Sequence, residues 1–430
     1  MRRPLASLLV LALLAACGER DDPPLPGERL ALRSGTFRNA VPAAAPRGIA
    51  LPAAQANADW THRGGAPDHA LGHVALGGAL RPLFSVPIGE GDSRRARITG
   101  EPVVAGGRVF TLDARRIVTA FSTGGELLWS RSVLPVPDQL ADASGGGLSS
   151  DGATVYVSTG YGRLTALNAA TGAPRWTQDL DALGSSSPTI LGDLVVIVSR
   201  DGRAYALEAA TGRIRWQEGS ISTAATWAGG AGAAARPGLI VVPFPSGEVL
   251  GLLPEGGLRR WETIVVGNRL GSAASFAATD IGGDPVLDEG LVYVGTYSGR
   301  LAALSADTGE TLWAIPEGAA SPVVPAADSL FLVNDVNELL RVEAATGGVI
   351  WRVPLPAAER RRGESAHVGP VLAGGRLIVA SSDGALRQFD PATGAPLGDV
   401  GLPAGAASAP VVAGGVLYVV TEDGRLNAFR

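Results

Sequence analysis

A glycine followed four residues later by a tryptophan recurs six times, and this repeat constrains the fold more than any other feature of the sequence. Successive tryptophans are 47, 40, 45, 52 and 38 residues apart. Repeats of about 40–50 residues are typical of β-propeller blades. The period therefore predicts a ring of small, similar sheets. The pairs are Gly125/Trp129, Gly172/Trp176, Gly212/Trp216, Gly257/Trp261, Gly309/Trp313 and Gly347/Trp351.

One copy of the repeat, Gly192–Trp216, reads as most of an antiparallel sheet. Leu194–Ser199 is apolar and β-branched, and Arg203–Glu208 alternates outward and inward residues. Between them, Asp201-Gly202 supplies the positive φ angles of a tight hairpin. A first strand precedes the copy, and a fourth begins at Ile214. Each repeat thus predicts one four-stranded blade.

The two ends of the repeat array indicate how the ring closes. A seventh copy, Thr393–Gly398, ends in glycine where tryptophan is expected, and an eighth begins at Ser408 but stops at Arg430 before a fourth strand. Because an unpaired strand edge promotes aggregation, the missing strand has to come from elsewhere. Leu80–Ile88 places Phe84 at the tryptophan position. We predict an all-β, eight-bladed β-propeller of four-stranded antiparallel blades, the last closed by this N-terminal strand.

Residues 1–16 have the parts of a bacterial export signal. Arg2 and Arg3 precede an apolar run that is too short to span a membrane. Leu14-Ala15-Ala16 before Cys17 resembles a lipobox, in which the cysteine becomes lipidated and forms the new N-terminus. An ordinary signal peptide and twin-arginine export are the alternatives. We predict a lipoprotein signal peptide at 1–16 and lipidation of Cys17.

Residues 17–56 are rich in proline and alanine and show neither helical nor strand periodicity. We expect a lipidated, flexible tether, disordered or partly laid along the surface. Gly18, rather than aspartate, follows the cysteine, and resemblance to lipoprotein sorting rules then favours the periplasmic face of the outer membrane. The propeller is expected at residues 57–430.

Composition argues against several kinds of function. The formal charge is −5, the isoelectric point is near 5.5, and lysine is absent, which disfavours a nucleic-acid groove and excludes Schiff-base chemistry. The single cysteine, once lipidated, leaves no disulfide and no thiolate for catalysis or zinc. We predict no catalytic residues, no cofactor and no metal.

Polar chemistry is concentrated in Asn57–Leu76. His69 and His73, with Asp68 beside them, would form a metal-binding pair if this segment were helical. Its three glycines and Pro67 favour a loop instead, and two histidines do not complete a metal site. We therefore expect a covering segment packed by Trp60.

The long connections between blades indicate where a partner would bind. In a four-stranded blade, the connections between blades share one end of the ring with the Asp-Gly hairpins. Loops on a rigid scaffold usually carry the binding sites. We therefore expect any partner site at that end. The long connections are Arg131–Ser149, Gln217–Pro237, Glu262–Asp284 and Val353–Gly369.

Three features stand out within these connections. Trp227 lies in a glycine-rich loop and either anchors a partner or fills a gap under the loop. Asp280 and Asp284 either accept hydrogen bonds from a partner or cap their own turn. Glu359–Glu364 carries three consecutive arginines, which form either a solvated face or a partner contact.

The repeat phrase, written DGR-x-x-A-L-x-A-x-T-G-x-x-x-W, resembles that of the pyrroloquinoline-quinone (PQQ) propeller superfamily over nearly the whole mature chain. Two branches compete. Quinone-dependent dehydrogenases need a catalytic aspartate, calcium ligands and, in most members, adjacent cysteines, which this sequence lacks. The recurring Asp-Gly pairs are hairpin turns rather than calcium ligands.

The other branch comprises BamB-like lipoproteins of the outer-membrane β-barrel assembly (BAM) machinery. This resemblance implies a non-enzymatic scaffold, a monomer within its complex, that binds the insertase BamA. The short outer strand edges of the blades would in addition allow pairing with unfolded outer-membrane proteins. It places the insertase contact in two loops that match Thr226–Gly230 and Asp280–Gly282, so Trp227, Asp280, Ile281 and Asp284 are the predicted partner-binding residues. The first loop lacks the family's arginine. A PQQ-dependent dehydrogenase, or a propeller that binds other envelope components, remains the alternative.

Overall fold

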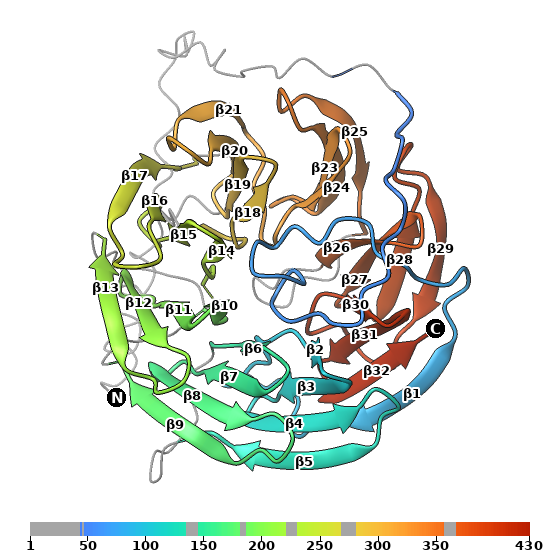
Figure 1. The fold of residues 1–430 in the computed structure, drawn as a ribbon. Helices are drawn as coiled ribbons and strands as arrows, with labels where there is room; N and C mark the ends of the chain where they lie inside the picture. Colours follow the sequence, from blue (N-terminus) through green and yellow to red (C-terminus); the bar gives the residue numbers. More distant parts are fainter. Residues whose placement is uncertain are drawn as a thin grey trace, which may run out of the picture. The chain divides into compact units, whose positions relative to one another are not determined.

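The computed structural model describes residues 44, 47–134, 145–180, 186–220, 230–267, 281–356 and 367–430. Within residues 41–430, which form one compact unit, every named element of these described ranges is a β-strand. The strands form eight separate four-stranded antiparallel sheets. The sheets stand as blades in a ring, and the middle of the ring, toward which the first strand of each blade lies, is called the channel here (Figure 1). The predicted eight-bladed propeller is confirmed.

The first four blades follow one another along the chain, each running from the channel outward. Blade 1 consists of β2 (Val103–Ala105), β3 (Arg108–Leu112), β4 (Ile117–Ser122) and β5 (Leu127–Ser132). Blade 2 consists of β6 (Leu148–Ser150), β7 (Thr154–Ser158), β8 (Arg163–Asn168) and β9 (Pro174–Asp179). Blade 3 consists of β10 (Thr189–Leu191), β11 (Leu194–Val198), β12 (Arg203–Glu208) and β13 (Ile214–Gly219). Blade 4 consists of β14 (Ala234–Arg236), β15 (Leu239–Pro243), β16 (Glu248–Leu252) and β17 (Arg259–Ile264).

The remaining four blades complete the ring. Blade 5 consists of β18 (Val286–Asp288), β19 (Leu291–Thr296), β20 (Arg300–Ser305) and β21 (Thr311–Ile315). Blade 6 consists of β22 (Val324–Ala326), β23 (Ser329–Val333), β24 (Glu338–Glu343) and β25 (Val349–Pro354). Blade 7 consists of β26 (His367–Ala373), β27 (Arg376–Ser381), β28 (Ala385–Phe389) and β29 (Pro396–Gly401). Blade 8 combines β30 (Val411–Ala413), β31 (Val416–Thr421) and β32 (Arg425–Phe429) with the N-terminal β1 (Pro82–Pro87).

The ring closes through the pairing of its first strand with its last. Strand β1 runs antiparallel to β32, from Pro82 opposite Phe429 to Pro87 opposite Arg425. Beyond the strands, Arg81 and Arg430 exchange two backbone hydrogen bonds of 2.8 Å each. The predicted closing strand is therefore confirmed.

The core lies between the faces of neighbouring blades. One cluster, for example, joins Phe110 and Val118 of blade 1 to Leu148 and Val157 of blade 2, all at most 2% exposed. The channel strand β2 is fully buried, whereas the rim strand β5 is largely exposed. This gradient explains why the inner strands of the repeat read as apolar and the outer strands as mixed.

The glycine and tryptophan of the repeat bind one blade to the next. The indole nitrogen of Trp129 in blade 1 donates a hydrogen bond of 3.0 Å to the Ala169 carbonyl in the last turn of blade 2. In the same turn, Gly172 has φ +68°, and a Cβ there would lie 2.6 Å from the Trp129 ring. Only glycine fits this combination of backbone angle and ring contact.

Blade 7 lacks the tryptophan for a structural reason. Each tryptophan packs on the last turn of the following blade, but blade 8 has no such turn because its last two strands, β32 and β1, are not consecutive in the sequence. Gly398 therefore faces open space, with no heavy atom within 4 Å of a Cβ built on it. In blade 8 itself, Phe84 replaces the tryptophan and packs on Gly125 of blade 1, as predicted.

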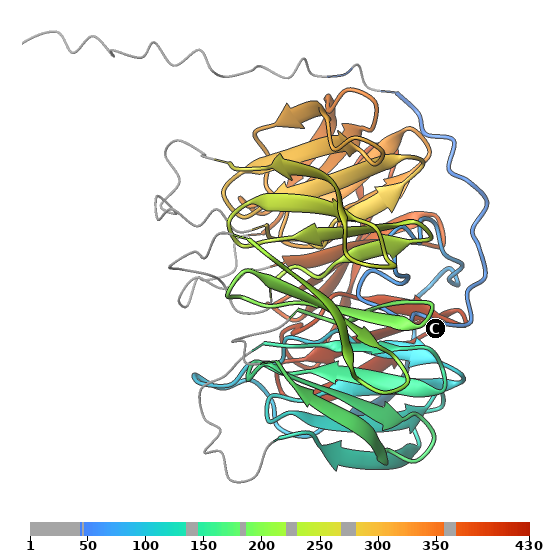
Figure 2. The same cartoon turned by 60° about the vertical axis from the view of Figure 1, so that its left-hand side comes forward.

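The strands define two ends of the ring. The loop end carries the second-to-third hairpins and the connections between blades, and the turn end carries the other turns. Residues 55–76, called the strap, cross the middle of the ring at the turn end, where the inner strands finish (Figures 1 and 2). Trp60 in the strap is only 5% exposed.

Candidate functional site

The predicted site residues divide into two groups. Cys17, Trp227 and Asp280 lie outside the described residues, as does the arginine run at 360–362. Ile281 and Asp284 are described, and they are only 3% and 2% exposed. Their side chains are therefore part of the interior, and the predicted partner contact does not fit their burial.

Asp284 joins the entrance of blade 5 to blade 4 and to the strap. Its Oδ1 accepts hydrogen bonds from the Gly232 backbone N–H at 2.8 Å and from the Arg63 guanidinium at 3.0 Å. The Nε2 of His69 lies 3.8 Å from its Oδ2. Asp284 thus holds inner strands and strap together, which the sequence pattern of a turn did not reveal.

Arg63 and Glu101 complete a buried ionic group around Asp284. Glu101 lies 3.5 Å from Arg63, and burial raises the pKa of its carboxyl despite the nearby guanidinium. Burial alone would lower the pKa of Arg63, but the charges of Asp284 and Glu101 outweigh that effect and raise it. The negative charge of Asp284 adds to the effect of burial and also raises the pKa of Glu101.

Ile281 contributes to a hollow at the loop end between blades 3, 4 and 5. The hollow is small, with about 20 Å³ of space for solvent. Its buried part includes Phe244 and Ile281, and its half-buried part includes Arg200, Pro245 and Tyr297. Two of its lining residues, Gly230 and Ile281, are the first residues of the described ranges 230–267 and 281–356.

Sequence reasoning missed this hollow, although the repeat carried a signal for it. The second-to-third hairpins of blades 4 and 5 read Pro-Ser-Gly and Tyr-Ser-Gly, whereas those of blades 3, 7 and 8 have a polar residue followed by Asp-Gly. Pro245 and Tyr297 thus stand where blades 3, 7 and 8 have Arg200, Ser382 and Glu422. They are the two hairpin side chains that give the hollow an apolar, half-exposed margin.

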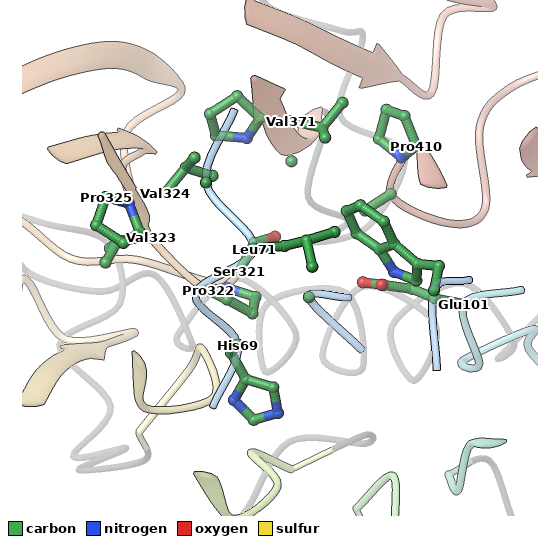
Figure 3. A pocket seen from close by; sticks show the side chains of 16 residues that line it. His69, Leu71, Glu101, Ser321, Pro322, Val323, Val324, Pro325, Val371 and Pro410 are labelled. Carbon is green, nitrogen blue, oxygen red and sulfur yellow. The ribbon is translucent and has the colours of Figure 1, made fainter. Parts of the chain in front are cut away.

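A second pocket lies in the channel, between the strap and blades 6, 7 and 8 (Figure 3). It leaves about 40 Å³ of space for solvent, and its lining is mainly apolar, including Leu71, Val324, Val371 and Pro410. The described residues contain no group of three or more His, Cys, Asp or Glu side chains able to hold a metal ion.

The strap histidines are engaged with the ring rather than with each other. His62 Nε2 accepts a hydrogen bond from the Ile190 N–H, and His73 Nε2 accepts one from the Gly375 N–H, each at 2.9 Å. His69 Nδ1 donates to the Pro285 carbonyl at 2.7 Å. As predicted, Asn57–Leu76 is a loop packed by Trp60.

Comparison with known proteins identifies the family. A family model described as outer membrane protein assembly factor BamB matches residues 114–353 and 337–430. The chain belongs to the BamB family. The BamB protein of Yersinia pestis is 25% identical over 294 residues, which cover 66% of this chain and 72% of that protein. No helix in the described ranges is long and apolar enough to cross a membrane.

Solved structures share the fold of this BamB-family chain. The crystal structure of BamB from Moraxella catarrhalis is 21% identical, with a TM-score of 0.65, over 82% of this chain and 100% of that one. A quinohemoprotein alcohol dehydrogenase from Comamonas testosteroni is 15% identical, with a TM-score of 0.66, over 86% of this chain and 80% of that one. The propeller fold is thus shared by BamB proteins and quinone-dependent dehydrogenases, and the match to the family model assigns this chain to the BamB family.

Proposed function

We propose that this protein is a non-enzymatic periplasmic scaffold of the outer-membrane β-barrel assembly machinery and that it binds the insertase BamA through its loop end. The observation that carries the proposal is the match of residues 114–430 to the BamB family model. The ring supports it, because the strand ends that the long connections join all lie at one end. Proteins with such scaffolds bind partners mainly through loops.

Within the loop end, the hollow between blades 3, 4 and 5 is the proposed contact. It offers a half-buried guanidinium and phenol, Arg200 and Tyr297, beside buried apolar side chains. Arginine and tyrosine are over-represented among residues that dominate protein–protein binding energy. The predicted contacts of Trp227 and Asp280 stay predictions, and Ile281 contributes as part of the buried lining of the hollow, whereas we no longer assign Asp284 a direct contact.

The lipid anchor at Cys17 is proposed to hold the ring near the outer membrane. Several acyl chains anchor a protein far more firmly than one, and tethering raises its effective concentration near a membrane partner. The last part of the predicted tether, residues 47–56, lies on the ring. Arg341, which is buried, donates hydrogen bonds to the carbonyls of Arg47 at 2.8 Å and Gly48 at 3.1 Å.

The contact of Arg341 with residues 47 and 48 lies at the turn end of blade 6. Beside it, Asp328 and Glu343 form ion pairs of 2.8 and 2.6 Å with Arg47. The tether therefore joins the ring at the end opposite the long connections. We infer that the loop end is left free for partners while the other end receives the lipid-anchored segment.

Affinity purification of the lipidated protein from solubilised membranes tests the proposal. Wild type should recover the insertase, and the double variant Arg200→Glu/Tyr297→Ala should recover at least tenfold less. Arg236→Glu, which makes the same charge change at the turn end of blade 4, should behave as wild type. Recovery of other envelope components without the insertase would favour the alternative partner class.

The dehydrogenase alternative has its own test. The protein should give no quinone-dependent dye reduction with calcium and a panel of alcohols. Sustained turnover that depends on added quinone would refute the non-enzymatic assignment.

A further inference from the structure

The strap runs once around the channel and visits the blades in their order around the ring. Starting at blade 8, Gly414 N–H donates to the Asn57 carbonyl at 2.7 Å. Trp60 then exchanges two backbone hydrogen bonds, of 2.7 and 2.9 Å, with Val104 of blade 1. Ser150 N–H of blade 2 donates to the Thr61 carbonyl at 3.0 Å.

The same progression continues through the other half of the ring. His62 accepts from blade 3, as described above. The Pro67 carbonyl accepts from Ala235 N–H of blade 4 at 2.8 Å, and the Asp68 carbonyl accepts from Leu287 N–H of blade 5 at 2.9 Å. Leu71 and Gly72 line the channel pocket beside blade 6. Val74 N–H donates to the Leu372 carbonyl of blade 7 at 3.0 Å.

The two ends of the strap also meet each other. Gln55 N–H donates to the His73 carbonyl at 2.9 Å, and Ala75 N–H donates to the Gln55 carbonyl at 2.8 Å. Gln55 and Val74 form a parallel β-bridge. The strap is therefore a closed circle of backbone contacts rather than a segment fixed at one place.

These contacts pair backbone groups that the ring itself leaves without a hydrogen-bond partner from a neighbouring strand. The first strand of each blade has a free edge toward the channel, and unpaired edge groups are costly when buried and reactive when exposed. The strap supplies carbonyl oxygens and imidazole nitrogens to those edges. Most of the donors are buried, including Val104, Ser150, Ile190, Ala235 and Leu287.

We propose that residues 55–76 act as an inner clasp, which closes the ring from the channel side and detaches from all the blades that it contacts in one cooperative step. The β1–β32 pair closes the ring at its rim, at one joint between two blades. The strap instead bonds to blades on every side of the channel. Because its ends pair with each other, loosening it at one blade removes support from the blades across the ring. This inference does not depend on the proposed function.

Hydrogen exchange of the wild-type protein gives the first test. The amides that donate to the strap should exchange at one common rate, because a single release of the clasp exposes all of them. The diagnostic amides lie in different blades: Ile190, Ala235, Leu287, Gly375 and Gly414. Rates that differ from blade to blade by more than tenfold would overturn the proposal.

A matched pair of tryptophan variants gives the second test. Trp60→Ala changes the strap beside blade 1, and we expect it to speed exchange at Ala235 and Leu287, in blades 4 and 5, at least tenfold. Trp216→Ala removes an equally buried tryptophan, 8% exposed against 5%, that binds blade 3 to blade 4. This control should leave Leu287 and Gly375 unchanged.

If Trp60→Ala sped amide exchange only in blades 8 and 1, the proposed clasp would be contradicted. If that variant does not fold, Asn57→Ala replaces it, because this milder change removes the side-chain hydrogen bonds to the Val412 carbonyl at 2.6 Å and to the Asp59 carbonyl at 3.0 Å. It should speed exchange at Ala235 and Leu287 by a common factor of about threefold or more. No change at these two amides would again overturn the proposal.

Discussion

Replacing Asp284 with asparagine tests whether this residue stabilises the ring rather than contacting a partner. The change keeps an oxygen that can accept from Gly232 N–H but removes the negative charge beside Arg63. Removing one partner of a buried ion pair costs about 3–5 kcal/mol, because the remaining charge stays buried without compensation. The Arg63 side chain is 17% exposed and keeps Glu101 at 3.5 Å, so the lower end of that range, about 3 kcal/mol, applies here.

The assay is urea unfolding at pH 7, followed by tryptophan fluorescence, with Asp307→Asn as the matched control. Asp307 forms an ion pair of 3.0 Å with Arg260, but its side chain is 72% exposed. Exposed pairs contribute only about 0–1 kcal/mol. A loss below about 1 kcal/mol in Asp284→Asn, equal to the control, would refute the assigned role of the buried ionic group.

Three further changes test other parts of the structure. Gly257→Ala should destabilise the ring by about 2–4 kcal/mol, because φ is +69° and the new Cβ would lie 2.7 Å from the Trp216 ring. The adjacent Gly256→Ala places its Cβ in open space and should cost under about 1 kcal/mol in the same urea unfolding assay. Burial, aided by the charge of His69, lowers the pKa of folded His62 to about 3, while the unfolded residue takes up a proton near pH 6.5. Wild type should therefore lose about 1.4 kcal/mol of stability per pH unit as the pH falls from 6.5 toward 3, and His62→Gln should abolish this loss. For Glu101→Gln the sign is opposite: burial raises the pKa of this carboxyl, so wild type should gain stability relative to the variant as the pH falls from 7 toward 4.5, and a constant difference would argue against the raised pKa.

The fold was predictable because its determinants are local and repeated. The glycine of one blade and the tryptophan of the preceding blade form one contact, so their spacing carries the period of the ring. Phe84 was recognisable as the eighth member of that series. The absence of tryptophan at Gly398 also follows from the closure, since blade 8 has no turn on which a tryptophan could pack.

The interior of the channel was much less predictable. Arg63, Glu101 and Asp284 are far apart in sequence and meet only because the strap passes the entrances of several blades. A sequence motif shows Asp284 in a polar turn, but burial depends on packing between separate repeats. The circular path of the strap was hidden for the same reason, because each of its contacts is with a different blade.

Site-specific photocrosslinking in cells tests the central claim, insertase binding by the loop end, most directly. A crosslinking amino acid placed at Tyr297, at the loop end, should give an adduct with BamA that mass spectrometry identifies. The same group placed at Arg236, at the turn end of the neighbouring blade, should give none. An adduct from position 236 alone, or none from either position in intact cells, would contradict the account.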